Sequence, residues 1–152
     1  MRIAIGSDHA GYELKQHLVK SLPAPDVEVR DVGPCTLDRG DDYPDFAYAV
    51  AEAVLSGECD LGIMICSTGV GACIAANKVR GIRAALSHDL FTARRSREHN
   101  DANVLCLGSK LVGPNLAEAI AREWIAQPFD GAERHRRRLA KVARLESSGA
   151  PD

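Results

Sequence analysis

The stretch Leu61-Gly62-Ile63-Met64-Ile65-Cys66, followed by Ser67-Thr68-Gly69-Val70-Gly71, decides the fold. Its first six residues are almost wholly apolar, which is typical of a central strand in a parallel sheet, where both faces are buried. The next five are small and glycine-rich, which favours a tight turn before a helix over residues 71–78. The stretch therefore predicts a strand, a turn and a helix of an α/β protein.

Similar patterns alternate along the rest of the chain. The expected strands cover residues 2–6, 27–32, 61–66, 82–86 and 104–108. Helical spacing of apolar residues, with proline and glycine at the ends, predicts helices over about 14–22, 44–54, 71–78, 88–98, 114–124 and 131–146. Strands that alternate with helices predict a parallel sheet covered on both faces, in which ligands bind outside the carboxyl ends of the strands. We expect one domain over 1–146 and a flexible tail over 147–152.

Composition excludes several classes of protein. The chain has 152 residues, of which 45% are apolar and 26% charged, so it can bury the core of one globular domain. No apolar run approaches the roughly 18 residues of a membrane span. The five cysteines contain no Cys-x-x-Cys pair, which leaves a zinc knuckle unsupported. Residues 1–20 hold no apolar signal stretch, so we expect a cytoplasmic protein with reduced thiols.

One basic segment stands out from an acidic body. Residues 131–146 contain six cations and two acids, whereas the rest of the chain contains thirteen cations and nineteen acids. Arg134, Arg138 and Lys141 share one helix face. Such a face is often merely solvated, and RNA binding is a second reading that the overall charge of −2 disfavours. Arginine also suits bidentate contact with a phosphate group.

Polar residues follow the strands at the expected ligand-binding edge. Cys66 ends a strand beside the amides of the glycine turn, a setting that favours a thiolate and suits an anion. A tight turn with a buried cysteine is the plainer reading. Asp8 and His9 follow the first strand, where Asp8 could also simply cap a helix. His99 lies near a helix end at the opposite rim of the sheet, so it reaches a site only through a loop excursion or a neighbouring subunit.

Seven motifs in order resemble the ribose-5-phosphate isomerase B family, which includes galactose- and allose-6-phosphate isomerases. The motifs are Gly6-Ser7-Asp8-His9-Ala10-Gly11, Asp42-Tyr43-Pro44, Cys66 to Gly71, Ala75-Ala76-Asn77-Lys78, Gly81-Ile82-Arg83-Ala84, His99-Asn100-Asp101-Ala102-Asn103, and Arg134-His135 with Arg138. The resemblance covers about residues 1–146. It implies a Rossmann-like three-layer sandwich with a five-stranded, mainly parallel sheet and an extended C-terminal helix.

The resemblance also implies an activity. It implies interconversion of ribose 5-phosphate and ribulose 5-phosphate in the pentose phosphate pathway, through a cis-enediolate and without metal or organic cofactor. It implies a homodimer or tetramer with shared active sites. The charge and the lack of a long apolar run lead us to expect neither nucleic-acid nor membrane partners. Cys66 would be the base, His99 would assist ring opening, and Thr68 would move the hydroxyl proton. The implied substrate-binding residues are Asp8, His9, Tyr43, Ser67, Gly69, Gly71, Asn100, Lys110, Arg134 and Arg138.

Two residues depart from the family pattern. Ser67 stands where many members have glycine, and Lys110 stands where many have a phosphate-binding arginine. Lysine keeps the charge but loses the bidentate fork. The preferred sugar therefore stays open, with a six-carbon sugar phosphate as the alternative substrate. A non-catalytic module that binds phosphate or nucleotide is the alternative from a different class.

Overall fold

The apolar run around Ile63 forms the middle strand of a five-stranded parallel sheet in the computed structural model, which describes residues 1–148. The strands are β1 (Arg2–Ser7), β2 (Glu28–Asp31), β3 (Leu61–Cys66), β4 (Ala84–Leu86) and β5 (Val104–Gly108). The helices are α1 (Tyr12–Ser21), α2 (Tyr43–Leu55), α3 (Val70–Ala76), α4 (Leu90–Asn100), α5 (Pro114–Ala126) and α6 (Glu133–Ser148). The strand order is β2-β1-β3-β5-β4, and each neighbouring pair is parallel.

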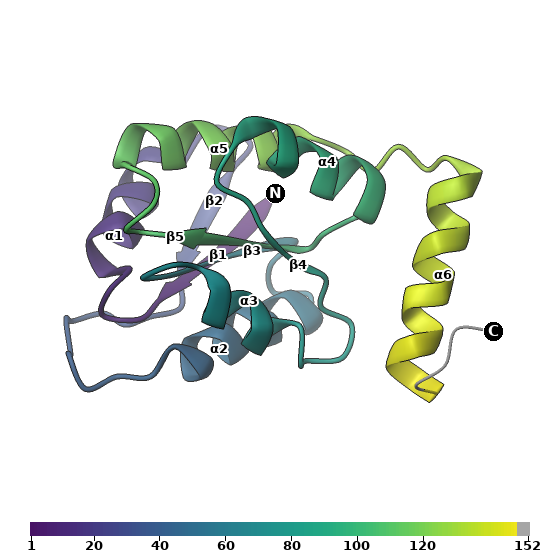
Figure 1. Cartoon of the computed structure of the whole chain (residues 1–152). Coiled ribbons are helices and arrows are strands. Elements are labelled where there is room, and N and C mark those ends of the chain that lie inside the picture. Colours follow the sequence, from purple (N-terminus) through teal and green to yellow (C-terminus); the bar gives the residue numbers. More distant parts are fainter. Residues whose placement is uncertain (149–152) are drawn as a thin grey trace.

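Helices cover both faces of this sheet, which confirms the predicted sandwich. Helices α1, α4 and α5 lie on one face, and α2 and α3 lie on the other (Figure 1). Because side chains alternate along a strand, Ile63 packs in the first layer and Met64 in the second. Gly62 lets α2 approach closely, since a Cβ there would lie 2.5 Å from the Cγ1 atom of Val50. The core therefore depends on both the apolar run and its glycine.

Strands β1 and β3 lie side by side, but the chain leaves them in opposite directions. Helix α1 leads from β1 to the edge strand β2, whereas α3 leads from β3 to the opposite edge strand β4. The two carboxyl ends are joined by a hydrogen bond in which the Asp8 backbone N–H donates to the Ile65 carbonyl at 3.2 Å. A topological switch point of this kind opens a crevice for ligands in α/β sheets.

Most boundaries differ from the prediction by one or two residues, and two of these differences bear on the argument. Strand β4 begins at Ala84 rather than at residue 82, because the Arg83 N–H donates to the Asn103 side chain at 2.7 Å instead of joining the sheet. The last helix continues to Ser148, so the start of the expected tail at residue 147 is two residues too early. Residues 149–152, the rest of that expected tail, lie outside the described part of the chain.

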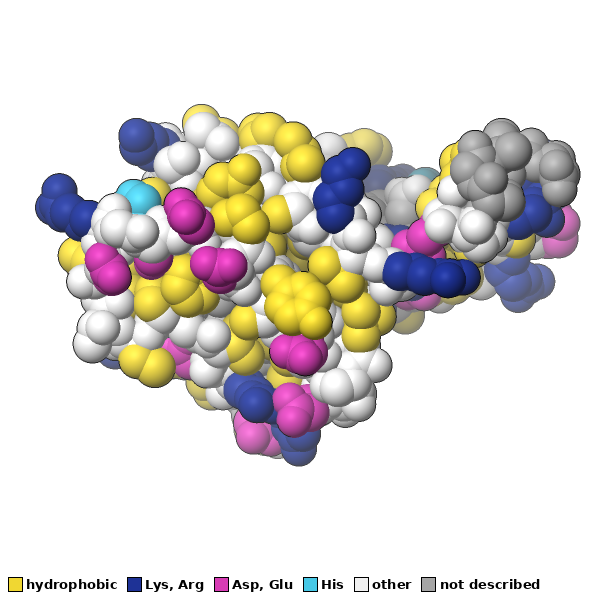
Figure 2. Space-filling model, turned by 90° about the horizontal axis from the view of Figure 1, so that it is seen from below, with side chains coloured by type: hydrophobic (Ala, Val, Ile, Leu, Met, Phe, Trp, Pro, Cys, Tyr) yellow, Lys and Arg dark blue, Asp and Glu magenta, His cyan; other side chains and the backbone are white. Residues whose placement is uncertain are grey.

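Helix α6 stands beside both layers and belongs to neither (Figure 1). It contacts α4, and the Gly81 N–H donates to the Glu146 side chain at 2.8 Å. An open apolar groove runs between it and the body, lined in part by Ile82, Ala85 and Val142. Figure 2 shows apolar patches on the face that carries α2 and α3, with α6 projecting beyond it. Among residues 1–148, no helix is long and apolar enough to cross a bilayer.

Candidate active site

The thiol of Cys66 lies at the carboxyl end of β3 under the glycine turn. Cys66 is 3% exposed, and its Sγ atom accepts a hydrogen bond from the Gly69 N–H at 3.1 Å. Gly69 has a φ of +77°, a left-handed conformation that favours glycine. That conformation turns the Gly69 amide back toward the sulfur. An amide donor at this distance stabilises negative charge on the thiol sulfur.

Two neighbouring segments hold the turn in place. The Tyr43 ring packs on the backbone of Gly71, where a Cβ would lie only 2.8 Å from the ring Cζ atom. The chain after β5 closes over the other side, because the Lys110 N–H donates to the Ser67 carbonyl at 3.0 Å. Thr68 is exposed at the top of the turn, and its hydroxyl accepts the Val70 N–H at 3.4 Å. The predicted residues at this edge are thus brought together.

His9 is held beside the turn by a carboxylate that sequence reasoning did not single out. The Oδ1 atom of Asp41 lies 2.7 Å from the His9 Nδ1 atom and accepts the His9 backbone N–H at 2.9 Å. The hydrogen bond to Asp41 raises the pKa of His9, while partial burial opposes the shift. Asp8 is buried and accepts the Gly11 N–H at 3.0 Å, so it does order the turn before α1. Asp42, the residue before α2, makes no side-chain cap hydrogen bond.

His88, in the segment that follows β4, is a second residue at this edge that sequence reasoning did not single out. Its Nε2 atom accepts the Gly108 N–H at 2.9 Å. One residue earlier, β4 and β5 are still joined by a backbone hydrogen bond, in which the Ser87 N–H donates to the Cys106 carbonyl. The imidazole therefore extends the pairing of β4 and β5 by one step. Gly108 lies directly against Thr68, since a Cβ on Gly108 would lie 2.6 Å from the Thr68 carbonyl oxygen.

The remaining predicted residues lie at the opposite edge of the sheet. His99 and Asn100 end α4, just before β5 begins, and Arg134 and Arg138 are exposed on α6. This edge is formed by the amino ends of the strands, whereas Cys66 lies at the carboxyl ends (Figure 1). The fold therefore divides the predicted residues into two separate groups within one chain.

The buried cysteines are not equivalent. Cys59 and Cys106 are buried, whereas Cys73 is only half-buried. A hydrogen bond with Cys106 lowers the pKa of Cys73 to about 7, against the opposing effect of burial. The same bond and burial raise the pKa of Cys106. Cys73 is therefore expected to be more reactive than the fully buried Cys106.

One group of side chains in residues 1–148 has the composition of a metal site. Ligand atoms of His99, Asp130 and His135 all lie within 4.8 Å of one another. Two arginines lie beside the group, because an Arg95 Nη1 atom is 3.2 Å from the His99 Nε2 atom and the Arg134 Nε–H donates to the His135 Nε2 atom at 3.2 Å. These cations disfavour a metal ion.

Comparison with known proteins gives one family. The model described as Ribose/Galactose Isomerase matches residues 3–142. Ribose-5-phosphate isomerase B of Escherichia coli is 46% identical over 145 residues, covering 95% of this chain and 96% of that protein. The structure of ribose-5-phosphate isomerase B from Clostridium thermocellum covers 99% of this chain and 100% of its own, with 50% identity and a TM-score of 0.93.

A further solved structure carries a ligand. The Mycoplasma genitalium ribose-5-phosphate isomerase B with bound ribulose-5-phosphate is 44% identical, covers 97% of each chain and has a TM-score of 0.90. Similarity extends over nearly the full length in sequence and in fold. The chain therefore belongs to the ribose/galactose isomerase family.

Proposed function

We propose that this protein interconverts ribose 5-phosphate and ribulose 5-phosphate, with Cys66 as the base. The observation that carries the proposal is the Cys66 thiol at the switch point, 3.1 Å from the Gly69 amide. Family membership supports the reaction class, and the relative with bound ribulose-5-phosphate supports the substrate class.

The isomerisation moves one proton between neighbouring carbons. The Cys66 thiolate takes the proton from C2 of the open-chain aldose and returns it to C1, so that a cis-enediolate forms in between. The exposed hydroxyl of Thr68 moves the second proton between the two substrate oxygens. In the proposed mechanism, backbone amides of the turn stabilise the negative charge that develops on those oxygens, and loss of one such donor would slow the reaction by about 10²–10³-fold. A positioned base contributes about 10²–10⁴-fold.

The phosphate group and the ring-opening step need the second group of residues. His9 lies beside the turn, and the Asp41 hydrogen bond that raises its pKa favours the charged form of the imidazole. Arg134 and Arg138, together with His99, lie at the far edge of the same chain. We infer a homodimer in which these three residues complete the site of the partner subunit. Each active site then contains Cys66 of one copy and α6 residues of the other.

Exposed apolar side chains support a second copy at the Cys66 edge. They surround the glycine turn and the start of α4. Scattered exposed apolar residues are normal on a protein surface, but a cluster of them indicates an interface. The members are Val70, Ile74, Leu86, Leu90, Phe91 and Leu111, exposed by 38% to 67%.

The first experiment measures formation of ribulose 5-phosphate from ribose 5-phosphate. The wild type should be active, and Cys66→Ala should lose about 10²–10⁴-fold in kcat. Cys35→Ala is the matched control, because Cys35 is an exposed thiol in a loop, and it should keep full activity. A folded but inactive wild type would reject the function, and an active Cys66→Ala would reject the mechanism.

The second experiment tests the shared site. Cys66→Ala chains are co-expressed with chains carrying both Arg134→Ala and Arg138→Ala, each inactive as a homodimer. Random pairing should restore about a quarter of wild-type activity, because half of the dimers then hold one intact site. No recovery in isolated mixed dimers would show that each chain builds its site alone.

Substrate choice is tested by comparing kcat/KM across sugar phosphates of different length. The five-carbon substrate should be preferred over allose 6-phosphate and galactose 6-phosphate. Preference for a six-carbon substrate would replace the proposed substrate but keep the reaction. Binding of a sugar phosphate without exchange of its C2 proton with solvent would instead indicate a non-catalytic binding module.

A further inference from the structure

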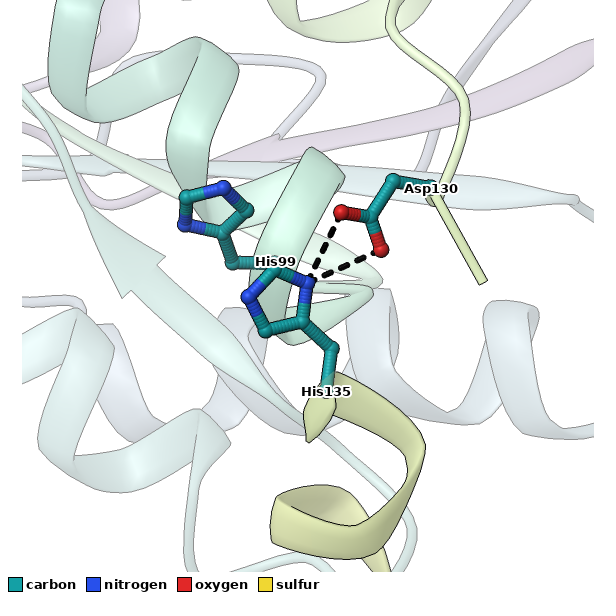
Figure 3. A group of neighbouring side chains, drawn as sticks. All are labelled: His99, Asp130 and His135. Atoms are coloured by element: carbon teal, nitrogen blue, oxygen red, sulfur yellow. Dashed lines mark hydrogen bonds and ion pairs between the residues drawn. The ribbon is translucent and has the colours of Figure 1, made fainter. Parts of the chain in front are cut away.

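His135 is the buried residue of an otherwise exposed helix. It is 2% exposed, whereas each other α6 residue from Glu133 to Ser147 is at least partly exposed. It lies in the first turn of α6, where α6 approaches the last turn of α4 (Figure 3). A buried imidazole needs partners for both ring nitrogens, and the structure provides them.

The two nitrogens of His135 have opposite roles. Both carboxylate oxygens of Asp130 lie near the Nδ1 atom, at 2.8 and 2.9 Å (Figure 3). A carboxylate can only accept, so Nδ1 carries the proton. The Nε2 atom then keeps its lone pair and accepts the Nε–H of Arg134 at 3.2 Å. The same bond to His135 lowers the pKa of Asp130, so the carboxylate stays charged near neutral pH.

Asp130 is itself fixed at two points. Its Oδ1 atom accepts the Ala132 N–H at 2.9 Å, which orders the turn before α6. Its backbone N–H donates to the Glu98 carbonyl at 3.0 Å, which ties this turn to α4. The position of α6 relative to α4 therefore depends on the segment that carries Asp130.

The face of the His135 ring contacts His99. The two ring centroids are 4.2 Å apart with an interplanar angle of 38°. On its other side the His99 Nε2 atom meets an Arg95 Nη1 atom at 3.2 Å. His135 thus contacts both a residue placed at the phosphate group and the residue placed at the ring-opening step.

We propose that Asp130 and His135 are positioning residues that orient Arg134 for the substrate phosphate and His99 for ring opening. The inference rests on the proposed isomerase function. Asp130 selects the tautomer of His135, the Nε2 lone pair orients the Arg134 guanidinium, and the ring face limits rotation of His99. Neither residue touches the substrate.

A metal ion is the competing use of these side chains. A metal ion would bind the Nδ1 atom of His135, which must then lose its proton. A neutral ring would then carry its proton on Nε2, where that proton would face the Arg134 N–H. Two donors would face each other at 3.2 Å. The network of hydrogen bonds avoids this repulsion.

Four variants and one control test the two positioning roles. His135→Phe keeps a ring against His99 but loses the acceptor for Arg134, so KM for ribose 5-phosphate should rise roughly threefold to tenfold with kcat nearly unchanged. His135→Ala loses both contacts, so kcat should fall as well. Asp130→Asn keeps an acceptor for Nδ1–H and should stay closer to wild type than Asp130→Ala. Arg137→Ala, on an exposed arginine of the same helix, is the control and should keep both constants.

A four-carbon aldose 4-phosphate tests the ring-opening role directly. Its O4 atom carries the phosphate, so it cannot close a furanose ring, and the fall in kcat caused by His135→Ala should disappear with it. The fall in kcat would persist if the variant merely damaged the fold. An equal fall with both substrates overturns the His99 role, and an unchanged KM in His135→Phe overturns the Arg134 role.

The tautomer can be measured without activity. Long-range ¹H–¹⁵N correlation spectra of the wild type should show His135 protonated on Nδ1, and zinc chloride should leave these signals unchanged. Protonation on Nε2, or stoichiometric zinc binding at His135, would overturn the inference. If the wild type and Cys66→Ala behave as proposed while the His135 variants match the wild type, only this inference fails.

Discussion

Alanine substitutions at Gly69 and at Gly57, compared with each other, separate the cost of backbone strain from the cost of steric overlap at the candidate site. Gly69 and Gly57 have nearly the same backbone conformation, with φ of +77° and +78°. Their surroundings differ completely. A Cβ on Gly57 would meet nothing within 4 Å, whereas a Cβ on Gly69 would lie 2.5 Å from Leu86 Cδ1, 2.9 Å from Leu107 C and 3.1 Å from Gly108 N.

The magnitude follows from these contacts. A left-handed conformation costs a non-glycine residue about 1–2 kcal/mol, and both variants incur this cost. Overpacking adds about 1–3 kcal/mol at Gly69 alone. The Leu86 side chain can rotate away, but the two backbone atoms of β5 cannot. Gly69→Ala should therefore destabilise the protein by about 1–3 kcal/mol more than Gly57→Ala does.

The assay is urea unfolding at one fixed protein concentration, followed by the fluorescence of the single, buried Trp124. Activity on ribose 5-phosphate is measured in parallel. Gly69→Ala should also lose on the order of 10²-fold in kcat/KM, because the amide that faces Cys66 shifts. Gly57→Ala should keep its activity. Equal destabilisation by the two variants, or full activity in Gly69→Ala, would refute the reasoning.

Three further predictions concern His9, Cys73 and His88. Asp41→Asn should lower the pKa of His9 in NMR titrations, because the Asp41 carboxylate raises that pKa above 6.5. The stabilisation of the folded protein by this pair is complete below pH 6.5 and is lost as the pH rises through the raised pKa of His9. An unchanged pKa of His9 in the variant would contradict the geometry. The rate of Cys73 alkylation by iodoacetamide, measured by peptide mass spectrometry, should rise with pH around a midpoint near pH 7. The hydrogen bond with Cys106 lowers the pKa of Cys73 to about 7. A midpoint near the ordinary thiol pKa of about 8.5 would argue against that bond. His88→Ala should lower the free energy of unfolding in urea by about 1–3 kcal/mol, because it leaves the Gly108 N–H unpaired. His88→Gln should restore part of this stability. Equal stability of the two variants would exclude the acceptor role of His88.

Local patterns were sufficient to predict the fold class. The apolar run ending at Cys66 and the glycines after it define β3 and its turn, because burial and left-handed backbone depend on the residues themselves. The alternation of strands and helices then implies a parallel sheet with its ligand edge at the carboxyl ends. The sequence therefore predicts that Cys66, Asp8 and His9 lie at one edge of the sheet.

Contacts between distant segments could not be predicted in this way. Asp41 reaches His9 across 32 positions of the chain, and nothing near Asp41 distinguishes it from the other acids of its loop. Strand β4 begins later than predicted because the side chain of Asn103, 20 positions away, accepts the hydrogen bond from the Arg83 N–H. The chemical environment of Cys73 depends on Cys106, which lies on another element.

The sequence by itself determined the strand–turn–helix unit and the residue types of the candidate site, because apolar periodicity and glycine conformation act over a few residues. The order of helix and strand also placed His99 at the edge opposite Cys66. Only the tertiary structure decided that Arg134 lies near His99 at that edge, and that His135 contacts both of them and Asp130. The physical reason is that hydrogen bonds and ring contacts form between elements only after the sheet and α6 have brought them within a few ångströms.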